Sequence, residues 1–236
     1  MNPLFLSRAL PPKRIEYRDE KKAIVLRPFE ADDAANFEEG VQASLPSLYR
    51  FMRWPDQDWT FSECLHWVVK RHAEYFSEVE LEWGCFDLTT GEFLGSIGVM
   101  RCTPFNADCF ELGFWISEKH MNKGIATICS QILSLICFDC LNIKRLQVGH
   151  AKGNDASKRV IEKCGFIHEG TFRGFTSPPS EERIQKGAVV SDTDYIYALL
   201  PEDCKKLPWH DKVSQATLIY PYHGAAQTLT QIQSCH

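Results

Sequence analysis

Apolar residues are spaced in two ways along this chain. Some form short runs that are rich in β-branched and aromatic residues and end at Gly, Pro, Asp or Ser, which is typical of strands. Others recur every three or four positions, which is typical of amphipathic helices. The runs predict seven strands, at residues 22–29, 81–88, 92–100, 109–117, 145–151, 166–173 and 194–200. The helical spacing predicts four helices, at residues 30–44, 60–76, 125–141 and 154–164.

The helix at residues 60–76 has a clear start signal. Thr60 and Glu63 have the spacing of a capping box, in which each side chain binds the backbone N–H of the other residue. Helical spacing then predicts that one face of this helix is buried, formed by Leu65, Val68, Val69, His72 and Phe76.

The order of these elements predicts an α/β (α+β) fold. Thr89-Thr90-Gly91-Glu92 lies between two apolar runs and predicts a hairpin, whereas later strands are joined through helices. Hairpins combined with strand–helix–strand connections indicate one mixed sheet covered by helices on its faces. We expect residues 22–200 to form this domain.

The two ends of the chain carry weaker patterns. Residues 1–21 contain two adjacent prolines and several charges without periodicity, so we expect an N-terminal extension. Residues 201–236 are expected to form a short helix followed by a partly ordered tail. Packing of the tail's aromatic residues on the domain, or association with a second subunit to give a homodimer, is the alternative.

Composition and charge are those of an ordinary soluble protein. Hydrophobic residues make up 44% and charged residues 24% of the chain, and the formal net charge is −5. Because nucleic-acid binding needs clustered Lys and Arg, we expect no direct nucleic-acid partner. The chain contains no apolar segment of bilayer length and no convincing secretory signal, so we expect no membrane association and a cytoplasmic location.

The ten cysteines are scattered, mostly within apolar runs. That distribution fits reduced cysteines that pack as small hydrophobic side chains. Cys137 and Cys140 form a CxxC pair, but zinc would need two further ligands at matching spacing and none is nearby. We therefore expect no metal.

Gly124 stands directly before the helix at residues 125–141. A glycine in this position is often only a turn, but it can also bring backbone N–H groups close to a phosphate. The GxxxxGK[ST] and GxGxxG patterns are both absent. Gly124-Ile125-Ala126 instead resembles the end of the pyrophosphate loop, Gln/Arg-x-x-Gly-x-Gly/Ala, of acetyl-CoA-dependent N-acetyltransferases.

A second motif strengthens this resemblance. The segment NDASKRVIEKCGFIHEG at residues 154–170 closely resembles the second acetyl-CoA motif of the GNAT acetyltransferases, and of their RimJ/RimL type in particular. That type acetylates the N-termini of ribosomal proteins. The order of the other elements agrees over about residues 22–200. The resemblance implies a GNAT fold, with a mostly antiparallel sheet of about seven strands, helices on both faces, and a split between strands four and five.

The resemblance also implies where acetyl-CoA binds. Backbone groups of Phe114, Trp115 and Ile116 are expected to contact the pantetheine arm and the thioester, and Asn154 to cap its helix and contact the pantetheine. The phosphates would bind the loop and helix start formed by Met121, Asn122, Lys123, Gly124, Ile125, Ala126 and Thr127. Met121 and Asn122 depart from the family pattern, but backbone donors provide most of this binding.

The catalytic groups are less clearly marked. Acetyl transfer by direct attack of an amine needs a base and a proton for the departing thiolate. The tyrosine that many GNAT enzymes use as the acid is replaced by Ile161, so the resemblance points to Ser157; the alternative is a serine satisfied by its own helix. Glu111 is the candidate base. A solvated edge carboxylate is the alternative, and the rival bases are a water chain, Asp108, Glu169 and His150.

Residues 174–193 form an unusually long insertion between the last two strands. In the family this hairpin overhangs the acceptor site, so we hypothesise a flap that selects the acceptor; a surface ornament is the alternative. The expected activity is acetyl transfer to a primary amine, most simply a protein N-terminal α-amine. The alternatives are a small-amine or antibiotic acetyltransferase and a non-catalytic acyl-CoA-binding module.

Overall fold

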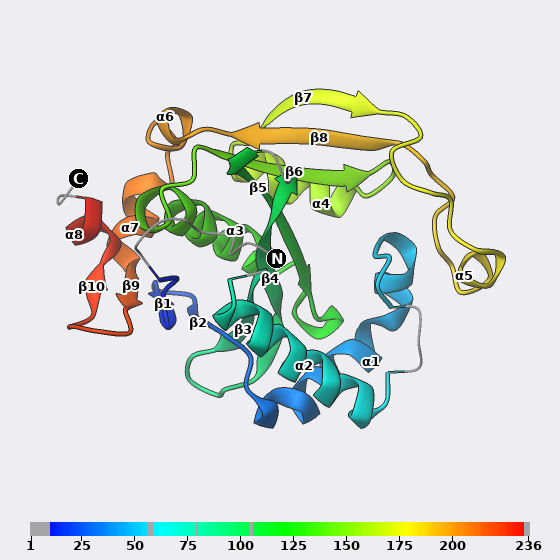
Figure 1. Ribbon diagram of the computed structural model, residues 1–236, viewed down its shortest axis with the longest axis horizontal. Coiled ribbons are helices and arrows are strands. Elements are labelled where there is room, and N and C mark those ends of the chain that lie inside the picture. Colours follow the sequence, from blue (N-terminus) through cyan, green and yellow to red (C-terminus); the bar gives the residue numbers. More distant parts are fainter. Residues whose placement is uncertain (1–9, 56–58, 79, 104–105, 234–236) are drawn as a thin grey trace.

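The computed structural model describes residues 10–55, 59–78, 80–103 and 106–233. Within these ranges ten strands form one sheet in the order β10-β9-β1-β2-β3-β4-β5-β6-β8-β7. Neighbouring strands are antiparallel except β5 and β6, which are parallel (Figure 1). The strands are β1 (Arg14–Arg18), β2 (Ala23–Arg27), β3 (Leu81–Asp87), β4 (Phe93–Thr103), β5 (Asn106–Ile116), β6 (Arg145–Ala151), β7 (Ile167–Phe172), β8 (Asp194–Leu199), β9 (Thr217–Tyr220) and β10 (Gln227–Thr228).

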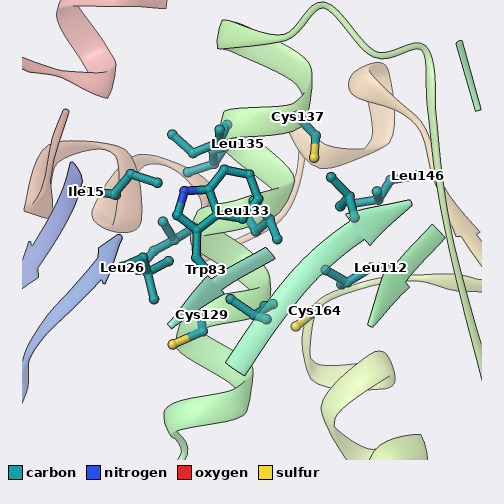
Figure 2. Packing of buried hydrophobic residues seen from close by; sticks show 14 of the residues in the cluster. Ile15, Leu26, Trp83, Leu112, Cys129, Leu133, Leu135, Cys137, Leu146 and Cys164 are labelled. Atoms are coloured by element: carbon teal, nitrogen blue, oxygen red, sulfur yellow. The ribbon is translucent and has the colours of Figure 1, made fainter. Parts of the chain in front are cut away.

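Helices cover both faces of this sheet. One apolar cluster joins α1 and α2 to the sheet, and a larger cluster joins α3, α4 and α7 to the opposite face. In the larger cluster, Trp83 of β3 lies against α3 near Leu133 (Figure 2). The helices are α1 (Ala34–Phe51), α2 (Phe61–Phe76), α3 (Ile125–Leu135), α4 (Asp155–Lys163), α5 (Glu181–Gln185), α6 (Pro201–Cys204), α7 (His210–Ala216) and α8 (Leu229–Gln233).

The seven predicted strands are confirmed as β2 to β8, but seven is not the size of the sheet. β1 lies inside residues 1–21, so the expectation that order begins at Lys22 is wrong. In β1 the side chains of Ile15 and Tyr17 are buried while charged residues alternate with them. This two-residue alternation is a valid strand signal, but it spans too few residues to stand out.

The described residues after Leu200 are structured rather than only partly ordered. Beyond α6 they contain α7, β9, β10 and α8, and β9 pairs with β1, with Ile15 opposite Ile219. Both isoleucines are buried, at 0% and 3% exposure. The two ends of the chain therefore complete one edge of the sheet together, at the left of Figure 1. Such pairing between distant segments cannot be read from local periodicity.

Helix α2 confirms its predicted start but not its predicted face. Thr60 caps the helix reciprocally with Glu63, as the spacing indicated. The buried positions are Cys64, Val68, Arg71 and Tyr75, whereas Val69 and Phe76 of the predicted face are about half exposed. The reason is electrostatic: Arg71 points inward because it binds Glu80 at 2.6 Å and Glu82 at 3.5 Å. The buried positions 64, 68, 71 and 75 have ordinary helical spacing, and one of them carries a charge.

The split in the sheet is confirmed. The parallel ladder between β5 and β6 has three pairs and ends where Glu111 faces Gln147. β5 continues to Ile116 and β6 to Ala151, so beyond this pair the two strands run apart. Backbone groups on the β6-facing edge of β5 then have no strand partner among the described residues.

Candidate active site

A cavity of about 270 Å³ lies where β5 and β6 separate. Its floor comes from the ends of these two strands, and the first turn of α4 contributes Asn154 and Ser157. The C-terminal end of α1 and the insertion between β7 and β8 line it as well. The cavity thus begins where the strand ladder stops at Glu111, and several segments that are distant in the sequence line it.

Glu111 lines this cavity from β5. It alternates with Leu112, which packs in the α3 cluster, and lies on the same face as Trp115, which packs with α1 and α2. The neighbouring Gly113 is exposed, and a Cβ there would meet nothing within 4 Å, so the space next to the carboxylate is open. Glu111 therefore faces the cavity on the α1 side of the sheet.

The pKa of the Glu111 carboxyl is raised. Burial is the main cause, a hydrogen bond with the Gln147 side chain opposes it, and the nearby Asp194 carboxylate raises the pKa further. A carboxylate with a raised pKa binds a proton more readily, so this environment favours a general base. The alternative of a fully solvated edge carboxylate does not fit this half-buried side chain.

Asp194 was not identified from the sequence. It is the first residue of β8, lines the same cavity, and accepts a hydrogen bond from the Thr176 hydroxyl at 2.8 Å. Its position before the apolar run of β8 made it look like a strand boundary. Only the pairing of β8 with β6 brings this carboxylate near Glu111.

The start of α4 places the hydroxyl group of the site. The Asn154 side chain caps α4 by accepting a hydrogen bond from the Ser157 backbone N–H at 3.1 Å. This cap fixes the first helical turn, in which Ser157 is half buried and lines the cavity. Ile161, one turn later, is buried in the core at 1% exposure. Of these two positions, only Ser157 presents a hydroxyl.

The loop before α3 has the backbone of an anion site. Gly124 is left-handed, with φ 74°, and caps the helix. Asn122 also has a positive φ of 61°, a conformation that asparagine tolerates better than most residues, so the departure from Gly is conservative. Residues 121–124 are exposed, and Ile128 N–H bonds back to Gly124 at 3.2 Å. The preceding amides of the first turn lack helical acceptors, which favours a bound phosphate.

The predicted loop residues do not all play the same part. Ile125 is buried at 7% exposure and anchors the helix, whereas Ala126 and Thr127 are half buried behind the loop. Lys22, the residue before β2, lies near Gly124: its Nζ would be 3.9 Å from a Cβ built on that glycine. This cation was not identified from the sequence, because it is 102 positions away along the chain.

The β5 residues predicted to hold the cofactor are core residues by their side chains. Trp115 packs on Phe37 and Phe93, at ring-centroid distances of 6.0 and 5.6 Å. Ile116 lies in the α3 cluster, and Phe114 is half buried against it and lines the cavity. Any contact of Trp115 or Ile116 with a ligand would therefore come from the backbone.

The insertion at residues 174–193 closes against the end of α1. Helix α1 runs seven residues beyond its predicted end, through Pro46 to Phe51. Val189 N–H donates to the Arg50 carbonyl at 3.0 Å, and the Arg183 guanidinium donates to the carbonyls of Met52 and of Arg53, the latter at 3.2 Å. Figure 1 shows α5 across from this end of α1. These contacts form the outer wall of the cavity.

Comparison with protein families decides what this arrangement is. A model described as an acetyltransferase (GNAT) domain matches residues 23–167, which is more than half of the chain. The chain belongs to this family. It is an acetyl-CoA-dependent N-acetyltransferase, and the alternative of a non-catalytic binding module is not supported.

Individual relatives agree with this assignment. YdaF of Bacillus subtilis, provisionally named a ribosomal N-acetyltransferase, is 28% identical over 153 residues, which cover 64% of this chain and 81% of that protein. The structure of Mycobacterium smegmatis RimJ in complex with CoA-disulfide has a TM-score of 0.71 at 18% identity, covering 100% of this chain and 97% of that one. RimL, an alpha-N-protein acetyltransferase solved with coenzyme A, has a TM-score of 0.66 at 17% identity, covering 78% and 97%. These two structures have the same fold as the chain.

The acetyltransferase has the groups needed to hold acetyl-CoA. The exposed loop at residues 121–124 and the first amides of α3 suit its pyrophosphate, and the unpaired edge of β5 suits its extended pantetheine arm. Bound acetyl-CoA would supply an activated acetyl thioester. Lys22 and Lys123 add positive charge at the same loop.

Two rival bases are less suited to proton transfer. Arg145 forms two hydrogen bonds with Glu169, at 2.9 and 2.5 Å, and these bonds lower the pKa of the Glu169 carboxyl. His150 lines the cavity but is buried, with its ring nitrogens 3.0 Å from the Ala151 carbonyl and 3.5 Å from the Tyr197 hydroxyl. Both residues have structural partners, which favours Glu111.

The described residues give no support for a metal site or for a membrane-spanning helix. No group of three His, Cys, Asp or Glu there could hold a metal ion, and the nine described cysteines are free. Cys235 lies outside the described residues. None of the helices in the described ranges is both long enough and apolar enough to cross a membrane.

Proposed function

We propose that the protein acetylates the α-amine of protein N-termini, with ribosomal proteins as the candidate acceptors. The single observation that carries the proposal is that Glu111, with its raised pKa, and Ser157 line one cavity at the split between β5 and β6. The names of YdaF and RimL support a ribosomal or protein α-amine acceptor. Such acceptors imply a cytoplasmic location.

In this proposal Glu111 accepts a proton from the attacking amine, directly or through one water molecule. An N-terminal α-amine has a pKa of about 7.7–8.0 and is therefore mostly protonated at pH 7, so its nucleophilic form has to be generated. The nearby Asp194 carboxylate also favours binding of a cationic ammonium group before the proton is lost.

Ser157 acts at the other end of the reaction. As the C–N bond forms and the C–S bond breaks, the sulfur becomes a thiolate and needs a proton. The Ser157 hydroxyl is our candidate donor, and the cap by Asn154 holds the turn that carries it. Backbone N–H groups near Phe114 and Trp115 would stabilise the negative charge on the thioester oxygen. An ammonium acceptor loses two protons, one before attack and one as the amide forms. One of them balances the proton that the sulfur receives and the other is released, so no acyl-enzyme is required.

The lining of the cavity suits an extended acceptor. Residues 49–53 at the end of α1 and residues of the insertion both line it, so a peptide whose first residue reaches Glu111 would run along these segments. The acceptor therefore contacts the segment that differs most from the family pattern. This agrees with the hypothesis that the insertion selects the acceptor.

The proposal is tested by release of the CoA thiol from acetyl-CoA. The acceptors are short peptides beginning with Ser or Ala, each with a free or a chemically blocked α-amine, and small amines that carry no peptide bond. We expect release only with free peptide α-amines. Release with small amines but not with peptides would overturn the proposed acceptor and leave the acetyltransferase assignment intact.

A further inference from the structure

We propose that the acceptor carries an acidic side chain within its first few residues, and that Arg50 in the cavity lining binds this carboxylate. The inference rests on the proposed function and specifies its substrate class. It comes from the charges that line the cavity, in which carboxylates belong to β5 and β8 and arginines to the end of α1 and the segment after it.

Arg50 is held in place without being neutralised. Its backbone carbonyl accepts the Val189 N–H, and its guanidinium lies over the Phe51 ring at 5.5 Å from the ring centroid. The residue is exposed and lines the cavity. Within the described residues no carboxylate lies at ion-pair distance from it, so its charge is available to a ligand.

Arg53 adds to the positive charge near Arg50. It also lines the cavity and is exposed, and its guanidinium donates to the Ser177 carbonyl of the insertion. A carbonyl group leaves the positive charge of an arginine uncompensated, unlike a carboxylate. Arg53 thus joins the insertion to α1 while increasing the potential felt by an anion near Arg50.

The carboxylates that line the cavity would repel an anion. They belong to Glu111 and Asp194, and their mutual repulsion already contributes to the raised pKa of Glu111. A peptide with a cationic N-terminus and a carboxylate a few residues later matches this polarity in one orientation only. Charge complementarity of this kind fixes orientation and selectivity more than it adds affinity.

The phosphates of acetyl-CoA do not explain these arginines. Arg50 lines the same cavity as Glu111, whereas none of the phosphate-loop residues 121–124 lines it. Arg50 therefore shares a cavity with the candidate base rather than with the phosphate loop. The anion assigned to Arg50 is accordingly that of the acceptor.

The test measures kcat/KM for matched peptides. Each begins with Ser and has a free α-amine, and a single Glu or Gln stands at position 2, 3 or 4. We expect at least one position at which Glu is favoured over Gln by about fivefold, the effect of a typical exposed ion pair. The preference should shrink as the salt concentration rises. Arg50→Gln should bring the Glu/Gln ratio to about one, and Arg50→Lys should retain part of it.

A matched control is Arg18→Gln, which removes an exposed arginine from β1, far from the cavity, and should leave the ratio unchanged. Equal kcat/KM for Glu and Gln at every position, or a ratio that survives in Arg50→Gln, would overturn the inference while leaving the proposed function in place. No turnover with any free-amine peptide would overturn the proposed function, and the inference with it.

Discussion

Glu111 of β5 and Gln147 of β6 form the last pair of the parallel ladder between these strands. Beyond them the strands diverge, and the cavity begins. The pair therefore places a carboxylate at the point where the sheet opens, on a rigid strand rather than on a loop. It also gives the carboxylate a side-chain amide partner that limits how far burial raises its pKa.

The first prediction concerns the pH dependence of activity. A base must be deprotonated, so the rate should fall as the pH drops through the raised pKa of Glu111. Asp194→Asn removes a carboxylate that raises this pKa. The acid limb of the kcat/KM profile should therefore move to lower pH. Asp192→Asn, at an exposed position two residues earlier, is the control and should leave the limb in place.

The second prediction concerns stability. Because the pKa of Glu111 is higher in the folded than in the unfolded chain, the folded state binds more protons between the two values. Stability therefore falls as the pH rises through that window. Glu111→Gln removes this loss of stability. At pH values above that range the variant should melt at a higher temperature than the wild type, and at pH values below it the two melting temperatures should approach each other. A difference that does not depend on pH would contradict the assigned cause.

The third prediction concerns the phosphate loop. Gly124→Ala introduces a Cβ at a left-handed position where the backbone should approach the pyrophosphate, so the Kd for acetyl-CoA should rise. Gly91→Ala is a close control, because Gly91 has nearly the same φ, 75° against 74°, and lies in the β3–β4 turn. Calorimetry should show similar destabilisation in both variants but weaker acetyl-CoA binding in Gly124→Ala alone.

The fourth prediction separates the two polar residues at the start of α4. Ser157→Ala should lower kcat by roughly 10- to 100-fold with little change in acetyl-CoA affinity, since it removes a proton donor that water replaces only in part. Asn154→Ala removes the helix cap and should cost about 1 kcal/mol of stability. Full activity in Ser157→Ala would remove this serine as the acid.

The sequence predicts the strands that surround the site because each carries its own apolar run. It also predicts the Gly124 loop and the Asn154 cap, since a left-handed turn and a helix start have local residue preferences. Arg50, Asp194 and Lys22 could not be found in this way. Each comes near the site only through contacts between segments that are distant in the sequence. Contacts of this kind leave no periodic pattern in the sequence.

The strands β1 and β9 near the edge of the sheet were also missed by sequence patterns. Ile15 and Ile219 are buried against each other's strands, yet each belongs to a run that is too short to be convincing by itself. Arg71 is buried although it was not part of the predicted buried face of α2. The charge of its side chain suggests exposure, and only the positions of Glu80 and Glu82 explain its burial.

The most direct test of the account compares wild type and Glu111→Gln on one Ser-initiated peptide, with fragment mass spectrometry to locate the acetyl group. We expect the wild-type protein to acetylate the α-nitrogen and to ignore the α-blocked peptide. Glu111→Gln should bind acetyl-CoA normally but lose about 100-fold or more in kcat/KM. An acetyl group on a lysine side chain, or undiminished turnover by Glu111→Gln, would contradict the account.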